Sequence, residues 1–304
     1  MDWQANFPLV EGLDMNIRDA FRAGSFYEET PTSCRHHAGK LLDSARLPGD
    51  LPATLYGGIV PHAGWLYSGR LAAMTFKALD QAGPLETVVL LGADHTGAVA
   101  MAEVFDSGVW RTPLGDVLVD ADLAGALIET GEPFRANPEA HRHEHSIEVQ
   151  VPLLAALRAG VKIVPVAVPP DAQAVEAGRA LGRLLAERFP RARVAGSSDL
   201  THHGGHFGSP GGHGSVGEQW TRQNDRRMID RIVAMDAEAI VAEALRHENA
   251  CGAGAIAATV AACREMGATR GVLLDYTNSY EVIHEMYPNT PDDTTVGYAS
   301  IVLA

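Results

Sequence analysis

Two histidines and a cysteine, widely separated in the chain, are the side chains best suited to bind a metal ion. His62 lies in the stretch GIVPHAGWLYSG, His95 in LLGADHTG and Cys251 in ENACGAGAI. Two neutral imidazoles and one thiolate are ligands for a divalent transition metal, and they would leave positions open for a substrate or oxygen. Cys251 stands at the expected start of an apolar helix, where the helix dipole lowers the pKa of a thiol. We therefore predict that the three residues form a metal site.

Each of these residues also has a purely structural interpretation. A single histidine at the end of a strand is commonly a hydrogen-bonded packing residue, and a free cysteine is commonly buried in a core. We assign Cys34 and Cys263 to that structural class, because Cys263 falls inside an apolar helical pattern and Cys34 has no evident partner. The metal hypothesis rests on the combination of the three residues and not on any one of them.

Further polar residues are candidates for proton transfer near this site. Asp199 and His202 are three residues apart in SSDLTHHG, so the carboxylate could fix the tautomer of the imidazole. The alternative is an aspartate that only caps the next turn. His145, in HRHEHSIE, is expected at a helix start with Glu148 on the same side, and we predict that it lines the site without binding the metal.

Two aromatic residues follow His62 closely and could contact a substrate. Trp65 and Tyr67 are predicted to form an aromatic wall for a planar substrate. In the competing interpretation, one of the two packs in the hydrophobic core.

Short apolar segments that precede these residues indicate strands covered on both faces. In an open α/β sheet, ligands gather beyond the carboxyl ends of the strands, which would bring His62, His95 and Asp199 to one edge. A change of pattern between Ala98 and Asp120, around the turn Arg111–Gly115, indicates local antiparallel pairing and therefore a mixed sheet. The expected strands are Leu55–Val60, Thr87–Leu91, Lys162–Val168, Arg193–Gly196, Gly271–Tyr276 and Val296–Leu303.

Helices are expected between these strands, each with a start or stop signal. We predict Gly69–Ala82 capped by Ser68, Ile147–Arg158 capped by Ser146, Ala172–Arg188 capped by Asp171, Ala237–His247 capped by Asp236, and Gly252–Met266 ended by Gly267. The segment Thr201–Gly217 contains seven glycines in seventeen residues and is expected to be a loop, with His203, His206 and His213 at its surface.

Composition limits the class of protein. The chain has 304 residues, of which 46% are hydrophobic and 20% charged, and we find no linker, so a single domain over 1–304 is expected. The net charge of −14 argues against nucleic acid or an anionic membrane as a partner. Three scattered cysteines and the lack of a signal peptide or apolar span favour the cytoplasm. A homo-oligomer is compatible with the sequence.

The motifs resemble the MEMO family, whose bacterial and archaeal members (AmmeMemoRadiSam system protein B) share a gene neighbourhood with a radical-SAM protein. They occur in the family order over nearly the whole chain. The matching stretches are AGSFYEETP, VPHAGWLYSG, LLGADHTG, WRTPLGDVLVD, EHSIEVQVPLL, VPVAV, SSDLTHHG, CGAGAI and VGYASIVL. A long glycine-rich insertion after His206 and Glu28 after Tyr27 depart from the usual pattern.

The family is similar to class III extradiol dioxygenases, which open catechol rings with non-haem Fe(II). The resemblance implies an α/β fold, an αβ(α) sandwich with a mixed central sheet. It also implies that His62, His95 and Cys251 are the metal-ligand positions, where a thiolate replaces the carboxylate of the dioxygenases. A softer ligand could favour copper or zinc over iron.

Three functional hypotheses follow. The first is an Fe(II)-dependent oxidoreductase in which O2 and a small, for example phenolic, substrate meet at the metal, with His202, Asp199 and His145 in catalytic roles. The second is a zinc-type hydrolase. The third is a non-catalytic module that binds a ligand or phosphopeptide in the ancestral cleft.

Overall fold

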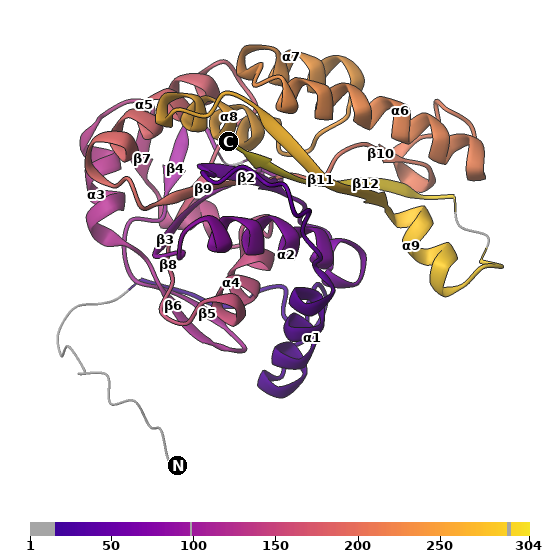
Figure 1. Cartoon of the computed structure of the whole chain (residues 1–304), viewed down its shortest axis with the longest axis horizontal. Helices are drawn as coiled ribbons and strands as arrows, with labels where there is room; N and C mark the ends of the chain where they lie inside the picture. The colour runs from indigo at the N-terminus through magenta and orange to yellow at the C-terminus, as the bar shows by residue number, and fades with distance from the viewer. Residues whose placement is uncertain (1–15, 98, 291–292) are drawn as a thin grey trace.

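A mixed β-sheet with helices on both faces forms the centre of the protein (Figure 1). The computed structural model describes residues 16–97, 99–290 and 293–304, and the side chain of His206 lies outside that description. The order of the hydrogen-bonded strands is β10-β12-β2-β9-β3-β8-β4-β7, and β11 pairs with β12. These strands are β2 (Gly57–Val60), β3 (Thr87–Gly92), β4 (Ala102–Val104), β7 (Phe134–Ala136), β8 (Lys162–Ala167), β9 (Arg193–Ser197), β10 (His202–His203), β11 (Gly271–Asn278) and β12 (Thr295–Leu303).

The parallel strands β2, β9, β3 and β8 form the middle of this sheet. Every residue of β2 and β3 is buried, as expected for strands covered on both faces. Val60 pairs with Ser197, and Leu91 pairs with Gly196, so the carboxyl ends of β2, β9 and β3 lie at one level. The loops that follow these three strands therefore begin side by side at one edge of the sheet.

Helices cover the two faces of the sheet (Figure 1). One layer contains α1, α2 and α4, and the other contains α5, α6, α7 and α8. Their bounds, with the remaining helices, are α1 (Pro31–Ser44), α2 (Trp65–Ala82), α3 (Ala121–Glu129), α4 (Val151–Leu157), α5 (Gln173–Arg188), α6 (Gly214–Val233), α7 (Ala237–His247), α8 (Ala253–Met266) and α9 (Ser279–Met286). Short 3-10 turns are η1 (Pro138–His141), η2 (Glu148–Gln150) and η3 (Gly205–Phe207).

Helix α8 is fixed closely against α5 by small residues. A Cβ atom added to Gly178 of α5 would lie 2.3 Å from the carbonyl oxygen of Ala258, and one added to Gly182 would lie 2.4 Å from that of Ala262. Larger side chains would force the two helices apart, because side-chain atoms do not approach backbone oxygens so closely. The close approach fixes the position of α8, the helix whose first residue lies two positions after Cys251.

A second, three-stranded sheet joins the N-terminal part of the chain to a hairpin. It contains β1 (Ile17–Arg18), β5 (Val109–Thr112) and β6 (Gly115–Leu118) in the order β1-β5-β6. The antiparallel pairing predicted around Arg111–Gly115 is therefore confirmed for β5 and β6. The preceding strand β4 pairs instead with β8 and β7 in the large sheet.

The six strands predicted from the sequence are all present, each with one end shifted by one or two residues. Several helix starts were predicted wrongly. Helix α2 begins at Trp65 with Gly64 as its N-cap, so Ser68 lies inside the helix, where its hydroxyl donates to the carbonyl of Ala63. The helix expected over Ile147–Arg158 is divided into η2 and α4, because the hydroxyl of Ser146 accepts from the amide of Ala93 and is not used as a cap.

The segment Thr201–Gly217 was predicted wrongly as a surface loop. Its first part forms β10, which pairs with β12, and its last part begins α6 at Gly214. His203 is 1% exposed, because its ring packs beside Trp220, whereas His213 is exposed and forms an ion pair with Asp293. One of the histidines in this segment, His203, is therefore a buried packing residue and not a surface residue.

The remaining helices lie within one residue of their predicted bounds, but α5 begins at Gln173 with Ala172 and not Asp171 as its N-cap. Asp171 accepts a hydrogen bond from the amide of Gln173, and Gly267 ends α8 with a φ of 113°. Helix α7 has the predicted bounds, although the side chain of Asp236 pairs with Arg231 and makes no capping bond. Among the described residues, no helix combines the length and apolar character needed to cross a bilayer.

Candidate metal centre

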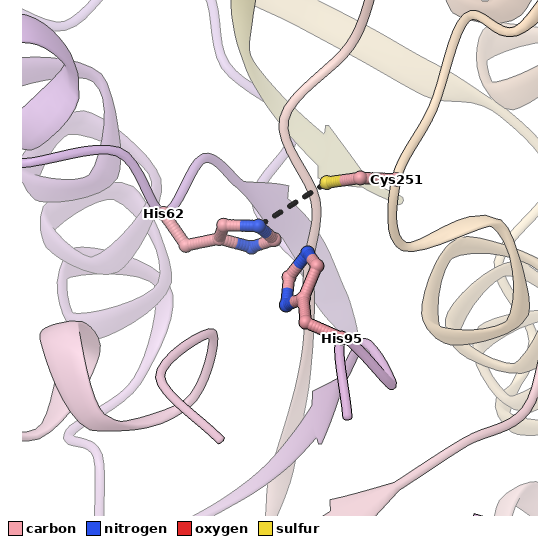
Figure 2. Close-up of side chains that lie close together, drawn as sticks. All are labelled: His62, His95 and Cys251. Atoms are coloured by element: carbon pink, nitrogen blue, oxygen red, sulfur yellow. Dashed lines mark hydrogen bonds between the residues drawn. The ribbon is translucent and has the colours of Figure 1, made fainter. Parts of the chain in front are cut away.

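His62, His95 and Cys251 converge at the edge of the sheet where β2, β9 and β3 end (Figure 2). One donor atom from each residue lies within 4.8 Å of the donors of the other two, and Cys251 Sγ is 3.2 Å from His62 Nε2. His62 is 2% exposed, whereas the side chain of His95 is 30% exposed. The group is therefore closed behind His62 and open to solvent on the side of His95.

The ring of His62 is held by a serine that sequence analysis overlooked. Ser197, the last residue of β9, donates its hydroxyl proton to the carbonyl of Ser146 at 2.7 Å, and its oxygen lies 3.1 Å from His62 Nδ1. Because the hydroxyl has only one proton to give, its oxygen must accept from His62, which places the imidazole proton on Nδ1. The lone pair of Nε2 then faces Cys251. Burial lowers the pKa of His62 well below its usual value. The electrostatic effects of the neighbouring His95 and His145 lower this pKa further.

Asp199 holds the backbone of the same histidine. Its Oδ1 accepts from the amide of His62 at 2.7 Å and from the amide of Ala63 at 3.2 Å. The pKa of Asp199 is raised by burial, which outweighs the effect of His202 and of these amides. The hydrogen bond predicted between Asp199 and His202 is not observed in the described part of the chain, because His202 Nδ1 bonds the carbonyl of Leu200 at 3.0 Å.

Glu144 orients His95 and was likewise not identified from the sequence. One carboxylate oxygen accepts from the amide of His95 at 2.7 Å, and the other lies 3.0 Å from His95 Nδ1. A carboxylate behind a histidine fixes the tautomer and makes the outer nitrogen a better ligand. Burial alone would lower the pKa of His95, but Cys251 and Glu144 raise it to about 10. Burial would raise the pKa of Glu144, but the hydrogen bond from His95 lowers it well below its usual range.

His145 joins the centre from the segment that carries Glu144. Its ring stacks on that of His95 with centroids 4.6 Å apart and meets the ring of His62 edge-on at 5.4 Å. The ring of Phe26 also contacts it edge-on, with centroids 5.0 Å apart. Burial and the charge of His95 lower the pKa of His145 to about 4. His95, Glu144 and His145 also form a second group whose potential ligand atoms lie within 4.8 Å of one another.

Two hydrogen bonds from backbone amides, one of Cys251 and one of the next residue, fix the position of Cys251. Its amide donates to the carbonyl of Asp199 at 3.2 Å, and the amide of Gly252 donates to Ser198 Oγ at 2.9 Å. A Cβ atom on Gly252 would lie 2.5 Å from the carbonyl oxygen of Ser197, so only glycine permits this approach. The lowered thiol pKa predicted for Cys251 is wrong, because burial raises it. A bound cation would deprotonate the thiol directly.

These residues fit a divalent transition metal. Bonds of about 2.0–2.3 Å to nitrogen and sulfur in tetrahedral geometry place ligand atoms about 3–4 Å apart. The separation of 3.2 Å between Cys251 Sγ and His62 Nε2 lies in that range. Both Nδ1 atoms are held by Ser197 and Glu144, which leaves the Nε2 atoms of His62 and His95 as the ligands. The donor set of two imidazoles and a thiolate suits zinc, copper or iron.

The two predicted substrate-contacting aromatics occupy different environments. Trp65 is 2% exposed and donates its indole N–H to the carbonyl of Val149 at 2.9 Å, so it cannot form the predicted wall. Its ring packs against Tyr27 and His37 in the core. Tyr67 is half-buried and stays a candidate for substrate contact. Phe26, which covers His145, is an aromatic neighbour of the centre that the sequence did not indicate.

Comparison with known proteins identifies relatives over almost the full length. The family model described as "Memo-like protein" matches residues 18–302. A MEMO1 family protein of Methanopyrus kandleri is 36% identical over 290 residues, which cover 92% of this chain and 96% of the relative. MEMO1 family proteins of Methanothermobacter thermautotrophicus and Pyrococcus abyssi are each 34% identical, over 94% of this chain and 99% of the relative.

Proposed function

Because the chain belongs to the Memo family, we propose that it is a metal-dependent oxidoreductase of the non-haem iron type, with its centre at His62, His95 and Cys251. The convergence of these three donors is the observation that supports the proposal. The dioxygenase-like chemistry comes from the family's resemblance to extradiol dioxygenases. The proposed partners are O2 and a small substrate such as a phenol, with no role for nucleic acid or a membrane.

Fe(II), when bound, supplies redox chemistry and open coordination positions for substrate and oxygen. The chain's own residues then divide the remaining tasks. Ser197 and Glu144 fix the two imidazoles, and the ring of Phe26 packs edge-on against that of His145. His145 lies beside both histidine donors, where it can bond a substrate hydroxyl.

His202 is the second proposed proton-handling group. Its Nδ1 is occupied by the carbonyl of Leu200, which leaves Nε2 free to accept a proton. Asp199 acts by a different route from the one predicted, since it positions the backbone of His62 and does not orient His202. In this proposal Asp199 is a positioning residue and His202 carries protons.

The thiolate supports a second candidate, a zinc-dependent hydrolase. Sulfur is a softer ligand than the carboxylate of extradiol dioxygenases, so zinc or copper could occupy the same donors. Elemental analysis of protein purified without added metal separates the candidates. Zinc as the dominant metal, with no redox activity, would favour hydrolysis.

Anaerobic reconstitution with Fe(II), followed by measurement of oxygen uptake with a panel of catechols, tests the first proposal. We expect uptake that depends on both iron and a substrate, and its loss in Cys251→Ser. Full iron occupancy without turnover over a broad panel would contradict oxidase or dioxygenase function. A Cys251→Ser variant that loses the metal but keeps its cellular role would instead support a non-catalytic binding module.

A further inference from the structure

Arg22 lies beside the centre. Its backbone is fixed by hydrogen bonds, whereas part of its guanidinium group has no hydrogen-bond partner among the described residues. Its amide donates to Glu148 Oε1 at 2.6 Å, and its carbonyl accepts from the amides of Ser25 and Phe26 at 3.0 and 2.9 Å. This turn fixes the backbone from which the side chain extends. The side chain is half-buried, so part of it remains open to solvent.

The charge of Arg22 is not neutralised within the described part of the chain. Glu148, whose carboxylate accepts the amide of Arg22, forms its ion pair with the buried Arg18 and accepts a further hydrogen bond from Tyr27. Nε of Arg22 is buried and has no hydrogen-bond partner among the described residues. A buried N–H without an acceptor is costly, so the side chain gains little from the protein itself, and its terminal N–H groups are the ones that a ligand can reach.

Two phenylalanines hold the guanidinium group and connect it to the centre. Its central carbon lies 5.1 Å from the ring centroid of Phe21 and 4.9 Å from that of Phe26. Phe26 in turn contacts His145, whose ring touches both His62 and His95. A flat ligand that reached from the metal donors across Phe26 would bring its far end to Arg22.

We propose that Arg22 binds the carboxylate of a small planar substrate whose other end lies at His62, His95 and Cys251. The two terminal N–H groups of a guanidinium form a fork that matches two carboxylate oxygens, and no other side chain offers this geometry. The substrate class is therefore an aromatic or similarly flat carboxylic acid. This inference rests on the metal-dependent function proposed above.

The test compares two probes of nearly equal shape, 3,4-dihydroxybenzoate and its neutral amide, 3,4-dihydroxybenzamide. Their affinities are measured by calorimetry with zinc-loaded protein, so that no oxidation interferes, and again with metal-free protein. We expect the wild type to bind the benzoate about 10- to 100-fold more tightly than the amide, because the charge-assisted bonds exist only for the acid.

Substitutions at Arg22 show whether this residue carries the preference. Arg22→Met keeps an apolar stem between the two rings and should reduce the affinity ratio to about one, whereas Arg22→Lys should give an intermediate ratio because it keeps charge without the fork. Arg227→Met, at an exposed position of α6, serves as the control and should keep the full ratio. Thermal melting monitored by circular dichroism verifies that each variant is folded.

The proposal is wrong if the wild type binds the two probes equally, binds neither at millimolar concentration, or keeps its preference in folded Arg22→Met. Displacement of the benzoate by inorganic phosphate at much lower concentration than by acetate would overturn the choice of a carboxylate. If the metal-dependent function proposed above is wrong, the binding measurements would give a different result. Zinc loading would then leave both affinities unchanged, while the ratio in metal-free protein would still depend on Arg22.

Discussion

Cys251 Sγ lies 3.2 Å from Nε2 of His62, although 189 positions of sequence separate the two residues. Two residues at the end of β9 hold both of them. Ser197 bonds the ring of His62, Asp199 bonds its amide, and the carbonyl of Asp199 accepts the amide of Cys251. One short segment at the end of β9 therefore sets the distance between two proposed metal ligands.

Ser197 should control metal affinity through the tautomer of His62. In Ser197→Ala, Nδ1 of His62 loses its acceptor, so the ring can rotate or carry its proton on the ligand nitrogen. We expect the affinity for zinc to fall about 10-fold or more, as for other residues that orient metal ligands. Competition with a fluorescent chelator gives the affinity.

A buried serine away from the centre is the control for this substitution. Ser300 bonds Thr75 at 2.7 Å in the core, so Ser300→Ala should lower the melting temperature while leaving zinc affinity unchanged. Equal zinc affinities for Ser197→Ala and the wild type would mean that the serine has only a structural role.

Glu144 should also control metal affinity, because its negative charge lies behind the ring of His95. Glu144→Gln keeps an oxygen that can accept from His95 but removes the negative charge behind the ring. We expect zinc affinity to fall about 10- to 100-fold. Glu103→Gln is the matched control, because Glu103 is also fully buried but pairs with Arg135 away from the centre. An equal loss in both variants would exclude a specific role for Glu144.

Gly252 should be required for the position of Cys251. In Gly252→Ala the new methyl group would meet the carbonyl oxygen of Ser197 at 2.5 Å, so the start of α8 must move away from β9. We expect lower metal affinity together with a loss of stability of about 1–3 kcal/mol from overpacking. Chemical denaturation and chelator competition measure the two effects.

Gly125 in α3 provides the comparison, since a Cβ atom there would meet nothing within 4 Å. Gly125→Ala should stabilise the protein by about 0.5–1 kcal/mol through helix propensity and leave metal binding unchanged. If Gly252→Ala also kept normal metal affinity, the close approach of Gly252 to Ser197 would not be what positions the cysteine.

Asp225 should make stability depend on pH. It is fully buried on α6, where it accepts from the amide of Thr201 and the hydroxyl of Tyr276, and burial raises its pKa to about 7. A carboxyl group with a raised folded pKa binds more protons when folded, so its contribution is complete below about pH 4 and declines as the pH rises to 7. At about 1.4 kcal/mol per pH unit, the decline is at most about 4 kcal/mol.

The substitution Asp225→Asn should remove this decline, because the amide keeps the hydrogen-bonding shape without a charge. We expect the variant to gain stability relative to the wild type between pH 5 and pH 8 in urea denaturation. Asp230→Asn, at an exposed position of the same helix, should show no such gain. Parallel stability curves for Asp225→Asn and the wild type would show that the buried carboxyl is not protonated in this range.

The strands and the convergence of His62, His95 and Cys251 could be predicted because buried parallel strands have a strong apolar pattern and their carboxyl ends meet at one edge. The shared edge led to His62 and His95, the expected helix start led to Cys251, and the family resemblance implied the same three residues. The αβ(α) arrangement of a mixed sheet between helical layers agrees with the structure.

Other features depend on tertiary contacts that the sequence does not reveal. Glu144 and Ser197 are ordinary polar residues whose roles appear only when their loops meet, although their positions beside His145 and Asp199 offered a weak signal. Trp65 was misassigned because an aromatic residue near a site looks the same whether it faces the substrate or the core. The thiol pKa was misjudged because burial outweighs the helix terminus.

The most direct test of the proposed centre is an X-ray absorption spectrum of the anaerobically reconstituted protein at the edge of the bound metal. We predict one ion per chain, with one sulfur at about 2.3 Å and two imidazole nitrogens at about 2.0–2.1 Å. The sulfur signal should vanish in Cys251→Ser and persist in Cys263→Ser, whose thiol is buried inside α8. A spectrum without sulfur, or one unchanged by Cys251→Ser, would contradict the account.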